Sequence, residues 1–368
     1  MTKKLEETRG KFTLVGKVAG MDRPNAYSED VQQDGNYAGK KRRRLNIGIR
    51  TSDTNEIFVG MFSFLPDKVY LWDNKERKTV NVPYETWKNN REGFESNKQI
   101  PLQSNINLSG TPQHLPSWDA MEYINQNLNN GDSVRVSGDI SYNQYQNKQT
   151  GDMVTSTNYN ITNVTKLDTP LDFEAEDFVE VNTFRQPFVY VDGYNDEEDK
   201  KFRIDGYAIN YREDYVPVEL VIDYEGDDDL KRMAKAYEQA VDFGALIDSY
   251  GFILNRAVED TVTEDDDFDL DFDDDILDAL LGKDDPNPTA VFTYVREMQM
   301  TGAESVEKDY YSDEDFTAEG DSVFDEEVEK EDKESDPLLG KSPASTMDFE
   351  ADNAFDDIDV DGDDDLPF

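Results

Sequence analysis

The chain has 368 residues, no cysteine and a formal net charge of −46, but its charge is unevenly distributed. Residues 1–168 contain 22 basic and 20 acidic side chains, whereas residues 169–368 contain 15 basic and 63 acidic ones. Because cysteine is absent, disulfides and thiolate metal sites are excluded; no apolar run reaches the ~20 residues of a membrane span, and the N-terminus lacks the apolar stretch of a signal peptide.

The protein is expected to be soluble, and the absence of cysteine is compatible with a reducing cytoplasm. The region from residue 9 to 168 alternates apolar and polar residues, which predicts β-strands. Strands are expected at 11–20, 44–50, 56–64, 131–142 and 154–166. Ser117 is expected to cap a helix over 117–128, where apolar residues recur at helical spacing. Five strands with a helix between the third and fourth follow the order of an OB barrel. The predicted fold class is therefore mainly β (α+β), beginning with an OB-fold barrel.

Residues 178–302 predict a second, acidic domain after a linker at 168–177. Strands are expected at 188–194, 202–211, 216–224, 245–258 and 290–300, and an amphipathic helix is expected at 227–241. The same order of strands and helix predicts a second OB-like barrel, which would be a divergent copy of the first. An acidic insertion at 263–281 is expected in a loop or a short helix.

From Ala303 onward the chain has 26 acidic and 4 basic side chains and no hydrophobic period. Such a segment cannot bury enough apolar surface to offset its chain entropy, so residues 303–368 are expected to be a disordered tail. The tail ends in an acidic and apolar tip, made of Asp363, Asp364, Asp365, Leu366, Pro367 and Phe368. A terminal Phe and its carboxylate suit an apolar pocket with a basic rim, which predicts a partner-binding peptide. The alternative is a solubilising tail that ends in Phe.

Three segments resemble bacterial single-stranded DNA-binding proteins. The terminal DDDLPF is similar to the tip of that family, KFTLVGKVAG (11–20) resembles its first strand, and GDSVRVSGDISYNQY (131–145) resembles its fourth. The resemblance implies an OB fold, sequence-independent binding of single-stranded DNA in replication, recombination and repair, and recruitment of a helicase, primase, polymerase or recombinase through the tip. The long insertion at 65–130 and the second domain depart from the family and favour a phage-encoded relative, in a bacterial cell or phage-infected host. Homo-oligomerisation is left open.

Binding single strands without sequence preference requires a cationic track for phosphates and aromatic faces for bases. Residues 40–44 form an uninterrupted basic run, and five adjacent cations are not expected to be buried. Phe58 and Phe62 are expected in the core rather than at the DNA surface. The predicted DNA-binding residues are Tyr27, Tyr37, Lys40, Lys41, Arg42, Arg43, Arg44, Arg50, Phe64, Tyr70, Trp72, Arg135, Tyr142, Tyr145 and Lys148.

No enzyme, cofactor or metal site is expected. The aspartates between Asp265 and Asp275 could hold the metal ions of a nuclease, but consecutive aspartates usually form a solvated loop. His114 is the single histidine, which argues against histidine-based catalysis. A further alternative is an acidic interaction protein or DNA mimic that does not bind single-stranded DNA itself. The basic run argues against a mimic, which gains nothing from five cations.

Overall fold

The computed structural model describes residues 3–33, 35, 37–146, 151, 153–260 and 291–317. Lys148, the aspartates at 265–275 and the tip at 363–368 lie outside the described residues. The first half contains, in chain order, β1 (Gly10–Ala19), β2 (Tyr27–Val31), β3 (Lys41–Arg50), β4 (Glu56–Phe64), β5 (Lys68–Asp73), β6 (Lys78–Pro83), α1 (Tyr84–Asn89), α2 (Arg91–Ser96), β7 (Gln99–Pro101), β8 (Ser104–Asn107), β9 (Gln113–Leu115), α3 (Ser117–Asn127), β10 (Ser133–Gln146) and β11 (Met153–Lys166). The second half contains β12 (Val181–Asp196), β13 (Lys201–Ile209), β14 (Tyr215–Asp223), α4 (Asp228–Ala240), β15 (Leu246–Asp260), β16 (Val291–Glu307) and α6 (Asp313–Thr317).

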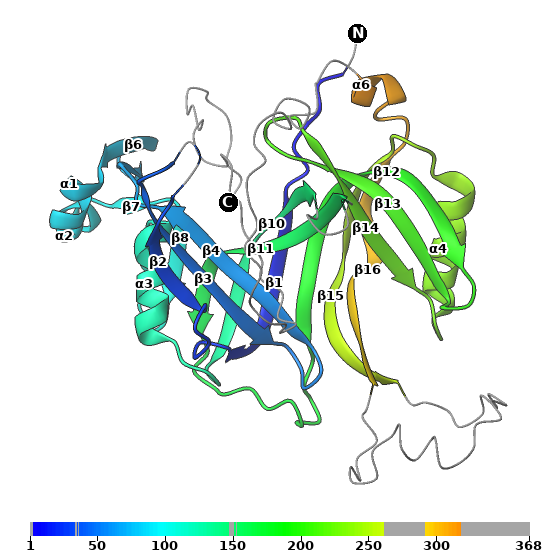
Figure 1. Cartoon of the computed structure of the whole chain (residues 1–368), viewed down its shortest axis with the longest axis horizontal. Coiled ribbons are helices and arrows are strands. Elements are labelled where there is room, and N and C mark those ends of the chain that lie inside the picture. The colour runs from blue at the N-terminus through cyan, green and yellow to red at the C-terminus, as the bar shows by residue number, and fades with distance from the viewer. Residues whose placement is uncertain are drawn as a thin grey trace, which may run out of the picture.

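Five strands of the first half pair in a closed ring, which we call the first unit. The order around the ring is β1, β3, β4, β11 and β10, and β10 pairs again with β1 (Figure 1). All neighbours are antiparallel except β4 and β11, which are parallel where Gly60 lies opposite Asn160. Helix α3 comes between β4 and β10 in sequence and flanks the ring on the left of Figure 1.

The second half repeats this arrangement in a second unit. Its ring runs through β12, β13, β14, β16 and β15, and β15 pairs again with β12. The parallel contact joins β14 and β16, at Val221 and Gln299. Helix α4 lies between β14 and β15 in sequence, as α3 lies between β4 and β10. The two halves therefore share one topology, strand for strand.

The two units join through the antiparallel pair of their first strands, β1 and β12, with Phe12 opposite Phe184. Gly138 of β10 lies opposite Phe12, and Gly251 of β15 lies opposite Phe184. Each glycine directly follows a break in the strand register. Phe12 and Phe184 thus occupy the same position in the two units, and an approximate twofold axis passes between them.

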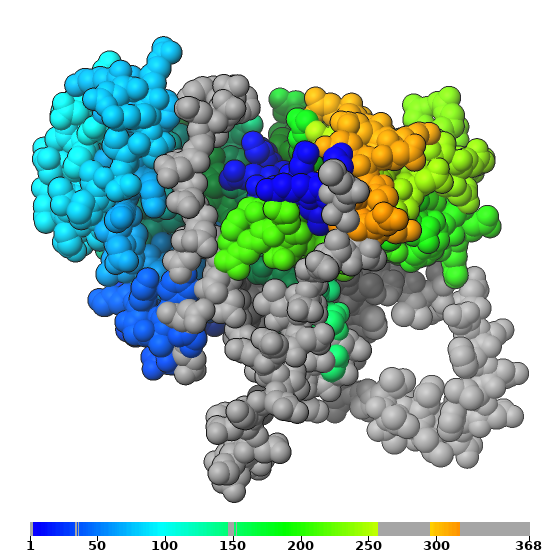
Figure 2. Space-filling view, turned by 90° about the horizontal axis from the view of Figure 1, so that it is seen from above, coloured from blue at the N-terminus to red at the C-terminus, as the bar shows by residue number. Residues whose placement is uncertain are grey.

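Each unit also extends the segment before its first strand onto the other unit. Thr8 precedes β1 and bonds with Ile209 at the end of β13: its amide donates to the Ile209 carbonyl (2.9 Å), and its hydroxyl accepts from the Ile209 amide (2.7 Å). Glu180 precedes β12 and accepts a hydrogen bond from Asn55 in the β3–β4 hairpin (2.8 Å). Figure 2 shows the dark-blue N-terminal residues against orange residues near the end of the described chain, where Leu5 is buried beside Tyr311. These contacts fix the two units against each other.

One buried cluster runs through both units and beneath the smaller sheet β6–β5–β7. Alternate residues of the ring strands point into this cluster; examples are Leu14, Ile47, Val136 and Ile204. This alternation leaves the intervening side chains of β3 and β4 on the outside of the first unit, where the candidate site lies.

The helices predicted at 117–128 and 227–241 are confirmed as α3 and α4, and Asp227 caps α4 by accepting from the amides of Asp229 and Leu230. The prediction that Ser117 caps α3 is wrong, because the preceding Pro116 occupies the cap position and no side chain bonds there. The prediction of a disordered tail from Ala303 is wrong for residues 303–317. There β16 runs to Glu307 and α6 follows, because Phe316 of α6 packs against aromatic rings of the second unit.

Candidate functional site

The antiparallel register of β3 and β4 places arginines opposite phenylalanines. Arg42 pairs with Phe64 and Arg44 with Phe62, while Leu45 and Ile47, farther along β3, are buried in the core. All four outward side chains are half-buried. We call this surface the β3–β4 outer face; it comprises Arg42, Arg44, Asn46, Gly48 and Arg50 of β3 with Glu56, Phe58, Gly60, Phe62 and Phe64 of β4.

Aromatic rings and cations alternate along this face. The Tyr37 ring stacks on Phe64 with centroids 4.5 Å apart and an interplanar angle of 17°, and Phe64 meets Phe62 edge-on at 5.1 Å. The Arg44 guanidinium lies 5.7 Å from the Phe62 ring centroid, and the Lys40 ammonium lies 4.9 Å from that of Tyr37. A row of rings with cations beside them can stack bases and attract phosphates at the same time.

Much of the basic run 40–44 is held by carboxylates of the neighbouring strand β2. Arg42 bonds to Asp30, and Lys41 lies 3.6 Å from Glu29. Exposed ion pairs of this kind contribute little to stability and exchange readily for other anions. The run is therefore cationic in sequence, but it is partly neutralised in the folded protein.

Arg43, which was predicted to bind DNA with the rest of the run, is buried and does not lie on the β3–β4 outer face. It points inward from β3, between β2 and α3, and is 8% exposed. Its guanidinium pairs with Glu29 and Glu122 (both 2.9 Å), donates to the Trp118 carbonyl (2.9 Å) and lies 4.1 Å from the Trp118 ring centroid. Strand alternation turns every second residue of the run inward, and a complete set of partners allows this one to be buried.

Two predicted tyrosines pack against the core rather than on the outer face. Tyr27 lies in β2 and contacts the buried cluster, and its burial raises its pKa. The Tyr142 hydroxyl donates to Gln186 (3.0 Å), and burial raises its pKa well above the ordinary value. Both rings are partly buried and lie outside the β3–β4 outer face.

Four other predicted residues lie away from the β3–β4 outer face. Tyr70 and Trp72 are half-buried on β5 of the three-stranded sheet, where Trp72 lies between Thr79 and Ile100. Arg135 is exposed on β10, with neighbours from β1 and β11. Tyr145 is 49% exposed near the end of β10. Of the described residues predicted to bind DNA, Lys40, Arg42, Arg44, Arg50 and Phe64 lie on or beside the face. Tyr37 lies beside it too, but its side chain is buried, 9% exposed, with its ring against Phe64. Lys41 is exposed but shares the partner Glu29 with Arg43 and is not part of the face.

The prediction missed Phe58 and Phe62, which are half-buried on the outer face rather than in the core. It also missed Arg23, whose guanidinium lies 5.0 Å from the Phe58 ring centroid. The strict alternation of β3 could have assigned the β4 phenylalanines, because Arg44 and Phe62 share one face once the hairpin register is set. No sequence pattern indicates Arg23, because it lies in the loop before β2 and belongs to no alternating strand.

The second unit carries a surface equivalent to this face. The amide of Thr51 bonds to the carbonyl of Asn55 (3.0 Å) to close the β3–β4 hairpin, and Asn210 bonds in the same way to Asp214 (2.9 Å) between β13 and β14. Counting along the strands from these closures, Arg44 corresponds to Arg203.

The same count shows that the second unit lacks the aromatic row. Pro217, Val221 and Asp223 stand where β4 has Phe58, Phe62 and Phe64, and Asp205 and Glu219 stand where the first unit has Asn46 and Gly60. Burial and the carboxylates of Glu219 and Asp192 raise the pKa of Asp205. The equivalent surface therefore carries Asp205, Glu219 and Asp223 beside Lys201 and Arg203, and its rings, Tyr207 and Tyr215, stand where the first unit has Gly48 and Glu56.

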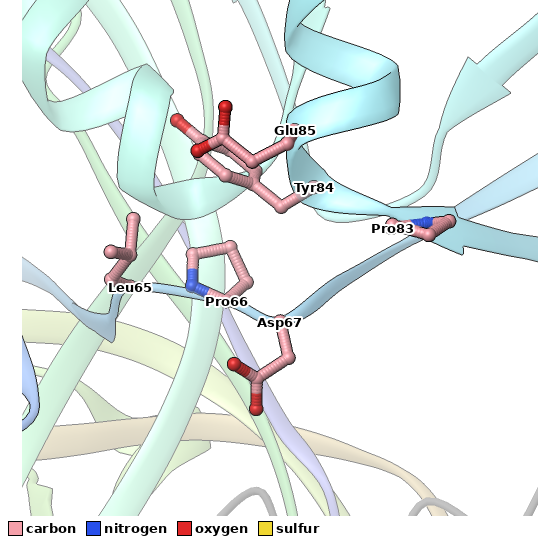
Figure 3. Close-up of a pocket in the computed structure, with 6 residues that line it drawn as sticks. All are labelled: Leu65, Pro66, Asp67, Pro83, Tyr84 and Glu85. Carbon is pink, nitrogen blue, oxygen red and sulfur yellow. The ribbon is translucent and has the colours of Figure 1, made fainter.

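A pocket of about 210 Å³ lies where β4 meets the three-stranded sheet, lined by Leu65, Pro66, Asp67, Pro83, Tyr84 and Glu85 (Figure 3). The Tyr84 hydroxyl donates to Asp119 (2.8 Å). The carboxylates of Asp67 and Glu85 would repel a phosphate group, so this pocket is not counted with the outer face.

Among the described residues, no helix is long and apolar enough to cross a membrane. The family model described as YorF matches residues 11–335 of the chain. This family differs from the bacterial single-stranded DNA-binding proteins that the sequence resembles. No curated protein sequence matches.

Two solved structures of the single-stranded DNA-binding protein from Thermus aquaticus are similar over most of their length. The wild-type structure has a TM-score of 0.36 and 10% identity, and covers 82% of this chain and 94% of its own. A deletion mutant has a TM-score of 0.35 and 9% identity, with coverage of 82% and 95%. These scores are too low to identify the fold of this chain.

Proposed function

The chain belongs to the YorF family, and we propose that it binds single-stranded DNA without sequence preference through the β3–β4 outer face. One observation carries the proposal: the hairpin register sets arginines opposite half-buried phenylalanines on an outward surface. Phenylalanines of a hydrophobic core are fully buried, and the solvent-exposed face of a sheet usually carries polar side chains. A row of half-buried phenylalanines on an outward face fits neither case.

The energetics favour a single strand over a duplex. Base stacking on an aromatic ring contributes roughly 1–3 kcal/mol per base, but only where the bases are unpaired. Phosphates of the strand would replace Asp30 as the partner of Arg42, so binding should weaken steeply with salt. Little base specificity is expected, because every base offers a ring face.

We further propose that the first unit is an OB-type barrel and the second an OB-like copy. The support is the closed ring of five strands, the one parallel contact between the third and fifth strands, and the helix between the third and fourth. In OB folds the second and third strands carry the oligonucleotide-binding face, and these correspond to β3 and β4.

The chain is also proposed to recruit replication, recombination or repair proteins through the terminal tip. This part is supported by the sequence of residues 363–368 alone. A non-enzymatic role in the cytoplasm agrees with both activities.

The second candidate is an acidic interaction protein that does not bind single-stranded DNA. The excess of acidic side chains in the second half, 63 against 15 basic ones in residues 169–368, favours it, because an acidic surface attracts a basic protein partner. The two candidates differ in what the first unit does, so a test of the β3–β4 outer face separates them.

The test is fluorescence anisotropy of labelled oligo-dT, compared with duplex DNA of the same length at two salt concentrations. Arg44→Ala and Phe62→Ala should each weaken oligo-dT binding roughly tenfold, consistent with the loss of one stacking or phosphate contact. Arg203→Ala is the matched control, because Arg203 occupies the equivalent position in the second unit. If the wild-type chain fails to bind oligo-dT at low salt, or if all three variants bind equally, the proposal is wrong.

A further inference from the structure

One carboxylate on the β3–β4 outer face holds two arginines. Glu56 Oε1 lies 2.8 Å from Arg23 Nη2, and Glu56 Oε2 lies 3.0 Å from Arg50 Nε. The Glu56 side chain is 22% exposed, whereas those of Arg23 and Arg50 are 47% and 58% exposed. The carboxylate is thus the least exposed of the three charged groups, and the two guanidiniums beside it are more accessible to solvent.

This group continues the row of rings. Glu56 and Phe58 are outward residues of β4, and the Arg23 guanidinium lies 5.0 Å from the Phe58 ring centroid. The Glu56 carboxylate lies close over β3 at Gly48. A Cβ built on Gly48 would stand 2.2 Å from Glu56 Oε1. A glycine at position 48 therefore makes room for the carboxylate beside the strand.

The second unit fixes the backbone that carries Glu56. The Asn255 side-chain amide donates to the Glu56 carbonyl (2.6 Å), and the Asn255 backbone amide donates to the Asn55 side chain (2.7 Å). The Glu56 side chain pairs with two arginines, and hydrogen bonds to the second unit hold the main chain of Glu56 in place. The carboxylate is therefore held where an anion bound to both arginines would sit.

We propose that Arg23 and Arg50 form a phosphate subsite at this end of the face, and that Glu56 occupies it until a DNA phosphate displaces it. The proposal rests on the function proposed above and adds a regulated contact to it. Arginine pairs with phosphate through the same parallel N–H donors that it uses for a carboxylate. The group has two positive charges and one negative, so an incoming phosphate must compete with Glu56.

The decisive variant is Glu56→Gln, which keeps the shape of the side chain and removes its charge. It should bind oligo-dT about fivefold more tightly at low salt, the equivalent of about 1 kcal/mol of released ion pairing. The slope of log K against log salt should steepen by roughly 0.7, the value expected for one further phosphate contact on a single strand. Glu95→Gln is the matched control, because Glu95 pairs with Arg91 on α2 (3.0 Å), away from the face.

A double-mutant cycle identifies the partner arginine. Arg23→Ala should weaken binding less than about twofold in the wild-type chain, where Glu56 neutralises Arg23, but about fivefold in the Glu56→Gln background. A merely structural role of Arg23 would give equal losses in both backgrounds. Thermal melting of each variant checks that the fold is retained.

The outcomes separate this inference from the proposed function. If the wild-type chain binds oligo-dT but Glu56→Gln binds equally or more weakly, the phosphate subsite is wrong and the proposed function stands. If neither protein binds oligo-dT, both are wrong. Inorganic phosphate is titrated at constant ionic strength as a further arm. Saturable competition with oligo-dT that Arg23→Ala weakens would support a phosphate subsite shared with DNA, and competition that Arg23→Ala leaves unchanged would contradict it.

Discussion

Single side chains on β3 have opposite roles according to the direction in which they point. Arg43→Met should lower the free energy of unfolding by about 1–3 kcal/mol, because Glu29, Glu122 and the Trp118 carbonyl all lose their donor. Its affinity for oligo-dT should stay within about twofold of the wild type, because the side chain does not reach the outer face. Urea denaturation and anisotropy measure the two effects. A larger loss of binding than that of Arg44→Ala would contradict the inward role.

The partner of Arg43 predicts a pH dependence of stability. The hydrogen bond from Arg43 is the main reason why the pKa of Glu29 is lowered from its ordinary 4.5. Because the folded-state value is the lower one, the ion pair stabilises the fold above pH 4.5, and this contribution is lost as the pH falls through the lowered pKa. The melting temperature of Glu29→Gln should therefore approach that of the wild type under acidic conditions and lie below it near neutrality. A constant difference between the two proteins would contradict this linkage.

At the scale of strands and helices, alternation predicted the long elements and missed the short ones. Strands such as β1 and β3 bury every second residue, so their period of two is visible in the sequence. The strands β7 and β9 have three residues each, and no period can emerge over so few residues; β7 also pairs with β5, from which two helices separate it in the chain. Strand β4 is apolar on both faces, so its sequence alone did not show that Phe58 and Phe62 point outward. The partners of Arg43 come from β2 and α3, and no local pattern brings these elements together.

The two equivalent glycines beside the register breaks should be equally intolerant of a side chain. A Cβ built on Gly138 would stand 1.8 Å from the Asn160 carbonyl oxygen, and one on Gly251 would stand 1.8 Å from that of Gln299. Gly138→Ala and Gly251→Ala should each lower the free energy of unfolding by at least about 2 kcal/mol, because the neighbouring backbone must shift. Ser137→Ala is the matched control. Unchanged melting of either glycine variant would show that the close approach is not required.

At the scale of the whole molecule, the two units share a topology but differ in charge. In the second unit Lys201 pairs with Glu297 (2.8 Å) and Arg203 with Glu219 (3.1 Å), on a surface without the phenylalanine row. If the first unit binds DNA as proposed, each chain should bind one short oligo-dT of about eight nucleotides, within the usual site size of an OB fold. Native mass spectrometry counts the strands bound per chain. Two strands per chain would show that the second unit also binds.

The joint between β1 and β12 also has a consequence for synthesis on the ribosome. One edge of β1, from Lys11 to Val15, pairs with β12, and Leu5 belongs to a buried cluster with Val189, Ile209 and Tyr311 of the second half. β1 and Leu5 are translated before the residues of the second half that cover them. Until those residues are made, the nascent first half has an open strand edge and an exposed leucine. An open edge is a template for pairing with another chain. A fragment that ends after β11 should therefore associate through the open edge of β1, whereas the whole chain covers that edge with β12.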